Sequence, residues 1–347
     1  MGFGERMSEM SDLNNRQKEF QRNNALELLL KDINALLAVA EDEIIDGFNA
    51  PKYPFLLVVG APRCGSTIMM QWLATTGIFA YPTNLISRFY RCPAIGAKLQ
   101  LLLTDARYNY NNELFDLNPK INFDSQLGKT RGALAPNEFW YFWRRFLPTI
   151  ELQYIRDDQL SSVDTSSLLA ELAAIEAVFD KPLAMKGHML ELNIPFFADA
   201  LPRSTYLFIK RSPFYNIQSL LQARMKYYGN INEWYSVKPR EYLDLIDLSP
   251  VEQVAAQVYL TNQSIEAGLS DVDDKRKIEI SYEKFCESPQ VVFERIRKRY
   301  YESGVETNWD YRGPAEFKST NQIHISDKDA YEIIDAYARI SGEQIVI

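Results

Sequence analysis

Short apolar runs alternate with amphipathic segments along most of the chain. The run Pro54–Gly60 is almost entirely apolar and is bounded by proline and glycine, which predicts a strand buried on both faces. Further strands are predicted at Pro182–Lys186, Ser204–Ser212 and Lys277–Glu283. Helical patterns lie between these runs, and strands that alternate with helices indicate a parallel sheet covered on both faces. The sequence therefore predicts an α/β fold with a central parallel sheet between layers of helices.

Helix-starting and helix-ending signals support this alternation. A helix is expected to begin at Thr67, directly after the first strand, a second to begin at Asp164 and a third to end at Gly229. Ser249–Glu252 is a capping box with proline at the first helical position, and Ser288–Pro289 opens a further helix. The first strand, its loop and the helix at Thr67 thus follow in the order that an anion site needs.

Two segments depart from the alternation. Met7–Ile45 carries apolar residues at roughly helical spacing, which predicts a helical arm packed on the domain or on a partner chain. Tyr81–Leu147 is interpreted as an insertion that builds a substrate pocket, although any single aromatic residue in it could belong to the core. These aromatic residues are Phe89, Tyr90, Tyr108, Tyr110, Phe115, Phe139, Trp140, Tyr141, Phe142 and Trp143. The predicted organisation is an N-terminal helical arm over 1–50 and a single domain over 51–347, with the insertion at about 81–150.

Composition narrows the class of protein. The chain has 347 residues, of which 46% are hydrophobic, so a sizeable core is expected. The formal net charge is −8 without a long basic run, which argues against a nucleic-acid surface. Cys64, Cys92 and Cys286 are widely spaced, so neither a disulfide framework nor a zinc site emerges. No signal-peptide core and no run approaching the ~18 apolar residues of a membrane span is found. A cytoplasmic protein is expected.

The segment GAPRCGST, from Gly60 to Thr67, differs at one position from a phosphate-binding loop. Gly60, Gly65 and Thr67 fit the Walker A pattern, but Ser66 stands where a lysine would reach the β- and γ-phosphates. The backbone N–H groups of a loop that enters a helix still favour an anion, and Arg63 within the loop could reach it. No strong strand candidate ends in an aspartate that would hold Mg²⁺. The segment therefore predicts a single phosphate-like group, bound without metal.

A second anion site is predicted one strand away. Arg211 closes the strand Ser204–Ser212, and Ser219 lies two turns into the following helix. Together this pair could hold a second phosphate beside the first strand.

Three motifs together resemble the sulfotransferases that use 3′-phosphoadenosine 5′-phosphosulfate (PAPS). They are the loop Pro62–Thr67, the Arg211 and Ser219 pair, and the segment SYEKFCESP. The closest resemblance is to the tyrosylprotein sulfotransferases and related bacterial sulfotransferases, whose P-R-S-G-T-T loop is matched here with two departures, Cys64 and Ser66. The resemblance implies a P-loop-like three-layer α/β/α fold, sulfuryl transfer, and PAPS as the donor without a metal.

The resemblance also implies roles for residues at matching positions. In the family the loop holds the 5′-phosphosulfate, the later arginine and serine hold the 3′-phosphate, a tyrosine lies near the adenine, and a late Ser-Thr segment folds over the donor. The implied donor-binding residues are Arg63, Cys64, Gly65, Ser66, Thr67, Arg211, Ser219, Tyr282, Ser319 and Thr320. Lys186 matches a lysine that stabilises the transition state, and Arg63 is expected to help, because fixed cations hold the charge of a breaking bond.

The general base is not supplied by the closest resemblance. The tyrosylprotein enzymes use a glutamate after the first helix, and the matching position falls near Asn84. Lys186-Gly187-His188 is instead similar to the K-T-H element of the cytosolic sulfotransferases, whose histidine is the base. Histidine is suited to proton transfer near neutral pH, so His188 is the preferred base.

Glu138 is the alternative base. It lies among aromatic residues that could desolvate it and raise its pKa toward a useful value. It could equally satisfy N–H groups at a helix start, or pair with Arg144 or Arg145. The choice between His188 and Glu138 therefore stays open.

The acceptor is not encoded in these motifs. The segment EFWYFWRRF and nearby arginines suggest a pocket that stacks on rings and attracts anions, the arginines being Arg88, Arg91, Arg144 and Arg145. A carbohydrate or glycolipid hydroxyl is expected, with a phenolic or other hydrophobic alcohol as the alternative. A P-loop kinase is disfavoured by Ser66, and a protein that binds PAPS without transferring sulfate is disfavoured by Lys186 and His188. A homo-oligomer could form through the N-terminal helix.

Overall fold

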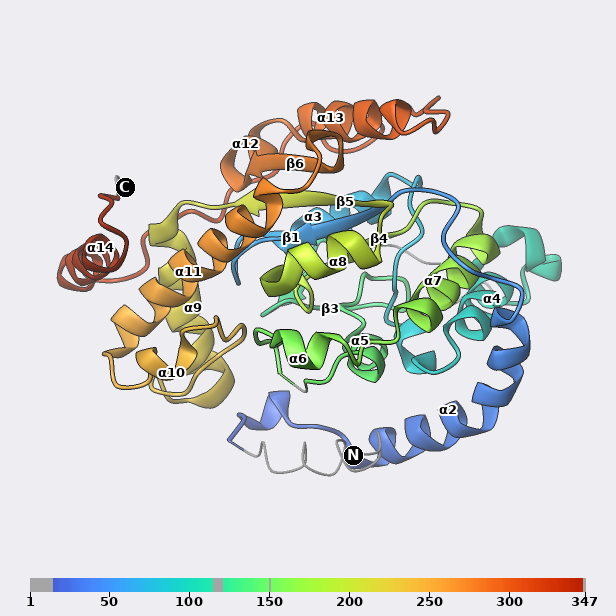
Figure 1. The fold of residues 1–347 in the computed structure, drawn as a ribbon, viewed down its shortest axis with the longest axis horizontal. Coiled ribbons are helices and arrows are strands. Elements are labelled where there is room, and N and C mark those ends of the chain that lie inside the picture. Colours follow the sequence, from blue (N-terminus) through green and yellow to red (C-terminus); the bar gives the residue numbers. More distant parts are fainter. Residues whose placement is uncertain (1–14, 115–120, 150, 346–347) are drawn as a thin grey trace.

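A parallel sheet lies at the centre of the computed structural model, which describes residues 15–114, 121–149 and 151–345 (Figure 1). Its strands run in the order β4-β1-β5-β6. They are β1 (Phe55–Val59), β4 (Ala184–Lys186), β5 (Ser204–Lys210) and β6 (Lys277–Ser281). Leu57 of β1 pairs with Met185 of β4 and with Tyr206 of β5. The predicted α/β fold with a parallel sheet is confirmed, and the carboxyl ends of all four strands meet at one edge.

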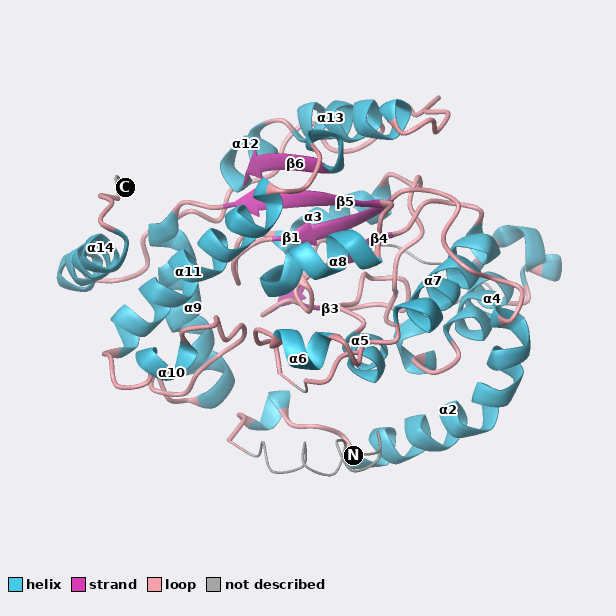
Figure 2. Cartoon of the chain, in the orientation of Figure 1, coloured by secondary structure: helices cyan, strands magenta, loops and turns pink. Residues whose placement is uncertain are grey.

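Helices follow the strands along the chain, as the alternating pattern of the sequence predicts (Figure 2). The predicted helices are α3 (Ser66–Thr75), α7 (Thr165–Phe179), α8 (Ile194–Ala200), α9 (Pro213–Tyr228), α11 (Pro250–Ser270) and α13 (Pro289–Glu302). The structure adds α4 (Pro93–Thr104), α5 (Trp140–Phe146), α6 (Asp157–Leu160), α10 (Tyr242–Leu245), α12 (Tyr282–Glu287) and α14 (Asp327–Ser341). Short 3-10 turns lie at Lys18–Phe20, Ile86–Phe89, Ala106–Tyr108, Tyr110–Asn112, Glu191–Asn193 and Asp274–Arg276.

Alternate residues of β1 belong to two different cores. Leu56 packs in a cluster with apolar residues of α3, α12 and α13. Leu57 packs in a second cluster with apolar residues of α5, α7 and α8. Both leucines are fully buried. Because successive side chains of a strand point to opposite faces, this division shows a sheet covered by helices on both sides.

Each strand is a little shorter than its predicted range, and the difference at β6 has a local cause. The prediction ran to Glu283, but β6 ends at Ser281, whose hydroxyl accepts from the backbone N–H of Lys284 (3.1 Å). This bond caps α12, so Tyr282 lies in the first turn of a helix. A serine ahead of a helix-compatible segment is a start signal that the strand interpretation overlooked.

The N-terminal helical prediction is right for part of its length. Helix α2 (Asn24–Ile45) begins after Asn23, whose side chain accepts from Leu26 N (3.2 Å). Residues 15–23 contain only a 3-10 turn, so the prediction of continuous helix is wrong there. Residues 7–14 of the predicted helix lie outside the described residues.

Buried polar side chains fasten α2 to the rest of the chain. Glu41 accepts from the backbone N–H groups of Ala94 (2.6 Å) and Ile95 (2.9 Å) at the start of α4. Asn34 donates to Arg88 O (2.7 Å). Both side chains are almost completely buried, so α2 is packed on the protein's own body. The segment before α2 runs along the lower edge of the view in Figure 1, below α5 and α6.

Candidate active site

A cavity of about 1250 Å³ opens at the edge where the four strands end. Each strand delivers one residue to its wall: Arg63 follows β1, Lys186 ends β4, Arg211 follows β5 and Tyr282 follows β6. Ligands of parallel α/β sheets bind at this edge. The structure therefore brings together four residues that the sequence analysis selected separately.

The loop between β1 and α3 has the backbone of an anion cradle. Gly65 has a φ of 101°, and a Cβ atom there would lie 2.4 Å from the ring of Tyr282, so only glycine fits. Arg63 also has a positive φ, 69°, which is uncommon for a residue with a side chain. Ser66 begins α3, so the loop ends at a helix N-terminus, where N–H groups and the helix dipole favour an anion.

Among the predicted donor-binding residues of this loop, Cys64 is the one that does not line the cavity. Its side chain is 1% exposed and packs in the core with apolar residues of β1 and α3. Burial raises the pKa of the thiol to about 11. The predicted donor-binding role of Cys64 therefore has no side-chain group at the cavity wall, whereas Arg63, Gly65, Ser66 and Thr67 line it.

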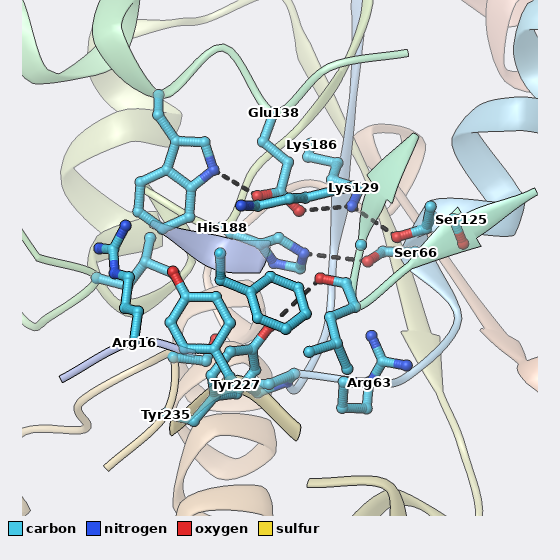
Figure 3. A pocket seen from close by; sticks show the side chains of 18 of the residues that line it. Arg16, Arg63, Ser66, Ser125, Lys129, Glu138, Lys186, His188, Tyr227 and Tyr235 are labelled. Atoms are coloured by element: carbon cyan, nitrogen blue, oxygen red, sulfur yellow. Dashed lines mark hydrogen bonds and ion pairs between the residues drawn. The ribbon is translucent and has the colours of Figure 1, made fainter. Parts of the chain in front are cut away.

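Lys186 lies between the loop and the aromatic insertion. Its Nζ atom donates to Thr67 Oγ1 (2.8 Å) and to Glu138 Oε1 (2.7 Å), and its side chain is only 5% exposed. Glu138 also accepts from the indole N–H of Trp140. Figure 3 shows Lys186, Glu138, Ser66 and His188 gathered around one part of the cavity. A buried cation is thus held at the first turn of α3.

The pKa of Glu138 moves opposite to the expected direction. Burial by itself would raise it, but the charge of Lys186, the charge of His188 when that imidazole is protonated, and the hydrogen bonds from Lys186 and Trp140 outweigh burial and lower the pKa to about 2. The expected pairing with Arg144 or Arg145 is wrong as well, since the ion pair is with Lys186. Glu138 is therefore held as an anion beside a cation.

His188 is held between two side chains. Its Nε2 atom lies 3.0 Å from Ser66 Oγ, and its Nδ1 atom lies 3.0 Å from Glu191 Oε2. Glu191 is fully buried and also accepts from the backbone N–H of Gly60 (3.2 Å). β4 ends at Lys186, so His188 lies in the following turn rather than in an extended strand as predicted; both side chains nevertheless line the cavity.

Arg211 lies at the other side of the loop. Its guanidinium donates to the carbonyl oxygen of Arg63 (3.0 Å) and to Thr320 Oγ1 (3.2 Å), and its centre lies 4.9 Å from the centre of the Tyr282 ring. Ser219 does not line the cavity itself, but its hydroxyl accepts from Arg63 Nε (3.1 Å). The predicted pair of Arg211 and Ser219 is thus connected through Arg63.

The late Ser-Thr segment reaches the site with only part of its predicted residues. The hydroxyl of Tyr282 lies 3.0 Å from Thr320 Oγ1, and Thr320 lines the cavity. Ser319 is not part of the cavity wall; its hydroxyl accepts from Asn321 N (3.2 Å). Asn321, which was not selected, accepts from Arg211 Nε (2.8 Å) and so orients that guanidinium.

Few aromatic residues of the insertion face the cavity. Of the aromatic residues named in the sequence analysis, Trp140 and Tyr141 line it, and Phe123, which was not named there, lines it as well. Tyr108 and Tyr110 are exposed elsewhere, and Phe115 lies outside the described residues. The core interpretation holds for the fully or almost fully buried Tyr90, Phe139, Phe142 and Trp143.

The predicted arginines divide in the same way. Arg88 and Arg144 line the cavity, whereas Arg145 pairs with the buried Glu171 (2.6 Å). Arg91 does not line the cavity, and Asn84, the position expected to match the family's glutamate, donates to Gly132 O (2.9 Å) and holds a loop.

Sequence reasoning missed a hairpin whose tip covers the site. Strands β2 (Ser125–Gln126) and β3 (Lys129–Thr130) are joined at Leu127 and Gly128. Gly128 has a φ of 87°, and a Cβ atom there would lie 3.3 Å from Glu138 Oε1. The carbonyl of Leu127 accepts from the Tyr235 hydroxyl (3.3 Å). The glycine within Ser125–Thr130 was the only local signal.

Sequence reasoning also missed the segment that precedes α2 as part of the wall. Gln17 N donates to Tyr227 O (2.8 Å), and the ring of Phe20 lies 4.9 Å from that of Tyr227. Arg16, Phe20 and Arg22 line the cavity. Contacts between residues so distant in sequence leave no trace in local periodicity.

Within residues 15–114, 121–149 and 151–345, no group of three or more His, Cys, Asp and Glu side chains is placed to hold a metal ion. None of the helices in these ranges is long and apolar enough to cross a membrane.

Both the sequence and the fold are similar to those of known sulfotransferases. A model described as the sulfotransferase family matches residues 54–300. The structure is similar to that of sulfotransferase STF9 from Mycobacterium avium, with a TM-score of 0.53 and 15% identity over 90% of this chain and 82% of that chain. It is also similar to sulfotransferase STF1 from Mycobacterium tuberculosis, with a TM-score of 0.49 and 10% identity over 88% and 81%. No curated protein sequence matches the chain.

Proposed function

This chain belongs to the sulfotransferase family, and on that premise we propose that it moves the sulfuryl group of PAPS to an acceptor hydroxyl by metal-free in-line displacement. One observation carries the proposal. Lys186 Nζ lies 2.8 Å from Thr67 Oγ1 at the first turn after the loop. A cation from a neighbouring strand therefore stands at an anion cradle that has no lysine of its own.

The residues at the strand ends fit an anionic donor with two phosphate positions. We assign the 5′-phosphosulfate to Arg63, Gly65, Ser66 and Thr67, and the 3′-phosphate to Arg211 with Ser219. Tyr282 and Thr320 lie beside Arg211 and are assigned to the adenosine part. Bound there, the donor would supply the sulfuryl group. Lys186 and Arg63 would stabilise negative charge as it develops, because fixed cations in a closed site need no rearrangement.

His188 is the proposed base. A carboxylate can only accept, so Nδ1 of His188 carries the proton that it shares with Glu191. Nε2 then has a lone pair that accepts from the Ser66 hydroxyl in this structure, and an acceptor hydroxyl that takes the place of Ser66 would give its proton to that nitrogen. Glu138 is the poorer base, because its pKa of about 2 and its ion pair with Lys186 both favour the anion. We assign Glu138 to the orientation of Lys186.

The proposed acceptor is a carbohydrate or glycolipid hydroxyl. Trp140, Tyr141, Tyr227 and Tyr235 present rings to the cavity, and such rings pack well on a sugar face or on a phenol. A phenolic or other hydrophobic alcohol is therefore the alternative. Transfer from labelled PAPS to a panel of both classes decides between them.

Titration with the product nucleotide, PAP, and with ATP–Mg²⁺ tests the donor. PAP should bind without metal and ATP–Mg²⁺ poorly, and EDTA should leave transfer unchanged. Preferential binding of ATP–Mg²⁺ together with loss of activity in EDTA would favour a kinase. PAP binding without transfer to any acceptor would favour a protein that only binds PAPS.

Arg211→Ala tests the assignment of the 3′-phosphate. The variant should lower the affinity for PAP by about tenfold to a hundredfold, the range for a lost charged hydrogen bond. It should lower the affinity for adenosine 5′-phosphosulfate, which has no 3′-phosphate, much less. Lys210→Ala is the matched control, because Lys210 pairs with Glu266 and Glu279 and does not line the cavity. Equal losses for the two nucleotides in Arg211→Ala would contradict the assignment.

The predicted organisation stays part of the proposal: a helical arm over 1–50 and a single domain over 51–347. A cytoplasmic location is proposed because Cys64, Cys92 and Cys286 are free thiols. A homo-oligomer through α2 stays a prediction, which light scattering tests. That helix exposes the apolar side chains of Leu28, Leu29, Leu36 and Val39.

A further inference from the structure

Four cationic side chains surround the part of the cavity that the proposed donor does not use. Arg16 and Arg22 come from the segment before α2, Lys129 from β3 and Arg144 from α5, and all four line the cavity. We call them the outer cationic cluster. They come from three separate parts of the chain, so the fold itself gathers them.

Three members of the outer cationic cluster have no carboxylate partner among the described residues. Among the residues that the structure describes, Arg16, Arg22 and Lys129 form no ion pair with a carboxylate, and Arg16 Nε is buried without a hydrogen-bond partner. Burial, and then the charge of Arg22, lowers the pKa of Arg144 to about 10. Burial, and then the charge of Arg16, lowers the pKa of Lys129. Like charges held together in this way favour an anionic ligand.

The carboxylates of the same cavity have other partners. Glu27 accepts from the Tyr141 hydroxyl (2.8 Å), and Glu151 pairs with Lys238. Glu233 accepts from Asn15 (3.4 Å), and Glu138 pairs with Lys186. Asp124 lies 3.9 Å from Arg131. Glu138, Glu151 and Asp124 are thus paired with cations outside the cluster, and the four cations of the cluster outnumber the two remaining carboxylates, Glu27 and Glu233.

Aromatic rings hold these cations in place and connect them to the proposed reaction centre. Arg16 lies 5.3 Å from the centre of the Tyr227 ring, and Lys129 Nζ lies 5.9 Å from the same centre. Arg144 lies 4.9 Å from the Trp140 ring, whose N–H donates to Glu138. Figure 3 shows Arg16 beside Tyr227, on the side of the cavity away from Arg63. A ring packed on these aromatic faces would keep an anionic substituent near the cluster.

We propose that the acceptor is a hydroxylated ring that carries an anionic substituent, and that Arg16, Arg22, Lys129 and Arg144 bind that substituent. The inference rests on the proposed function, because only a transferase has an acceptor. An acidic sugar and a phenol with an acidic substituent share this chemistry.

Matched acceptor pairs test the proposal. p-Nitrophenyl glucuronide is compared with p-nitrophenyl glucoside, and 4-hydroxybenzoate with 4-hydroxybenzamide, so that each pair differs in one carboxylate. For at least one pair, kcat/KM with labelled PAPS should be about tenfold or more higher for the acidic member. The pair that responds identifies the sugar or the phenol. Equal values within both pairs would overturn the proposal.

Variants of the outer cationic cluster test whether it causes the preference for the acidic acceptor. Arg16→Gln and Lys129→Gln, separately and together, should reduce kcat/KM for the acidic acceptor far more than for its neutral partner. Lys18→Gln is the control, because Lys18 is exposed on the same segment and does not line the cavity. An equal loss for both acceptors in the double variant would overturn the assignment. These side chains are at the wall rather than in the core, and thermal melting checks that the variants are folded.

Equilibrium titration separates this inference from the proposed function. Each acceptor pair is titrated in the presence of PAP, and a preference for the acidic member supports the inference even if no transfer is detected. Absence of PAP binding and of transfer counts against the proposed function. PAP binding and transfer without any charge preference counts against the inference alone.

Discussion

Nε2 of His188 lies 3.0 Å from the hydroxyl oxygen of Ser66, the residue that stands where a Walker A loop has its lysine. A serine at this position cannot make the lysine's contact with a triphosphate, but its hydroxyl is a hydrogen-bond partner for His188. Lys186, two positions before that histidine, provides the missing cation from another strand. The loop thus joins a cation and the proposed base at one helix N-terminus.

His188→Ala should lower kcat by roughly 10²–10⁴-fold, the range for lost general-base catalysis, and leave PAP affinity nearly unchanged. Glu138→Gln should cost less. Glu138, with a pKa of about 2, cannot produce an acidic limb of kcat/KM between pH 5 and 8, where histidine commonly titrates. If the wild type shows such a limb and His188→Ala does not, the limb reports the titration of the histidine, which identifies it as the base. An active His188→Ala beside an inactive Glu138→Gln would transfer the role to the glutamate.

Glu191→Gln should lower kcat while PAP still binds, and by less than the roughly 10²–10⁴-fold expected for loss of the base itself. Glu191 Oε2 accepts from His188 Nδ1 and Gly60 N, and within the described residues its Oε1 atom is buried without a partner. The carboxylate is therefore a positioning group that also stabilises a protonated imidazole. Removing its charge should move the acidic limb of kcat/KM to lower pH. A loss of kcat with an unmoved limb would indicate a purely structural role.

Gly128→Ala should lower kcat, because the added Cβ atom would lie 3.3 Å from Glu138 Oε1 in a backbone with a φ of 87°. Gly132→Ala is the matched control: its φ is 107°, but a Cβ atom there has no neighbour within 4 Å. Both variants should lose about 1 kcal/mol of stability through backbone strain, and only Gly128→Ala should lose activity. Equal kcat in the two variants would show that the hairpin tip does not influence the site.

Glu41 should make folding stability depend on pH. Burial raises the pKa of Glu41 from 4.5 to about 7, despite the hydrogen bonds from Ala94 and Ile95. A carboxyl with a raised pKa in the folded state stabilises the fold fully below its unfolded pKa, and that contribution is lost as pH rises through about 7. Between pH 5 and 8 the free energy of unfolding should therefore fall in the wild type, by on the order of 2 kcal/mol, relative to Glu41→Gln.

Urea titrations at several pH values measure this difference. Glu43→Gln, which changes an exposed carboxylate of the same helix, is the control and should follow the wild type. Parallel pH curves for the wild type and Glu41→Gln would contradict the prediction.

Local signals were enough for the sheet and for the residues at its strand ends. Pro54–Gly60 is an almost entirely apolar run, Lys186 ends a predicted strand and His188 lies two residues beyond it, so period and spacing located them. The pKa of Glu138 could not be found in this way, because its direction depends on Lys186, a residue distant in sequence. Glu191 was missed for the same reason: its partner Gly60, directly after β1, is distant in sequence. Sequence periodicity therefore predicts the helices and strands. The ionisation and the partners of Glu138 and Glu191 depend on tertiary contacts, which periodicity does not contain.

Cys64 has a consequence for redox chemistry. A thiol that is 1% exposed, with a pKa near 11, has almost no thiolate for peroxide or an alkylating reagent to attack. A Cβ atom at Gly60 would lie only 2.8 Å from Cys64 Sγ, so an added oxygen atom would have little room. Packing therefore protects the Cys64 thiol from oxidation to a sulfenic acid. The anion-binding loop can contain a cysteine without responding to oxidants.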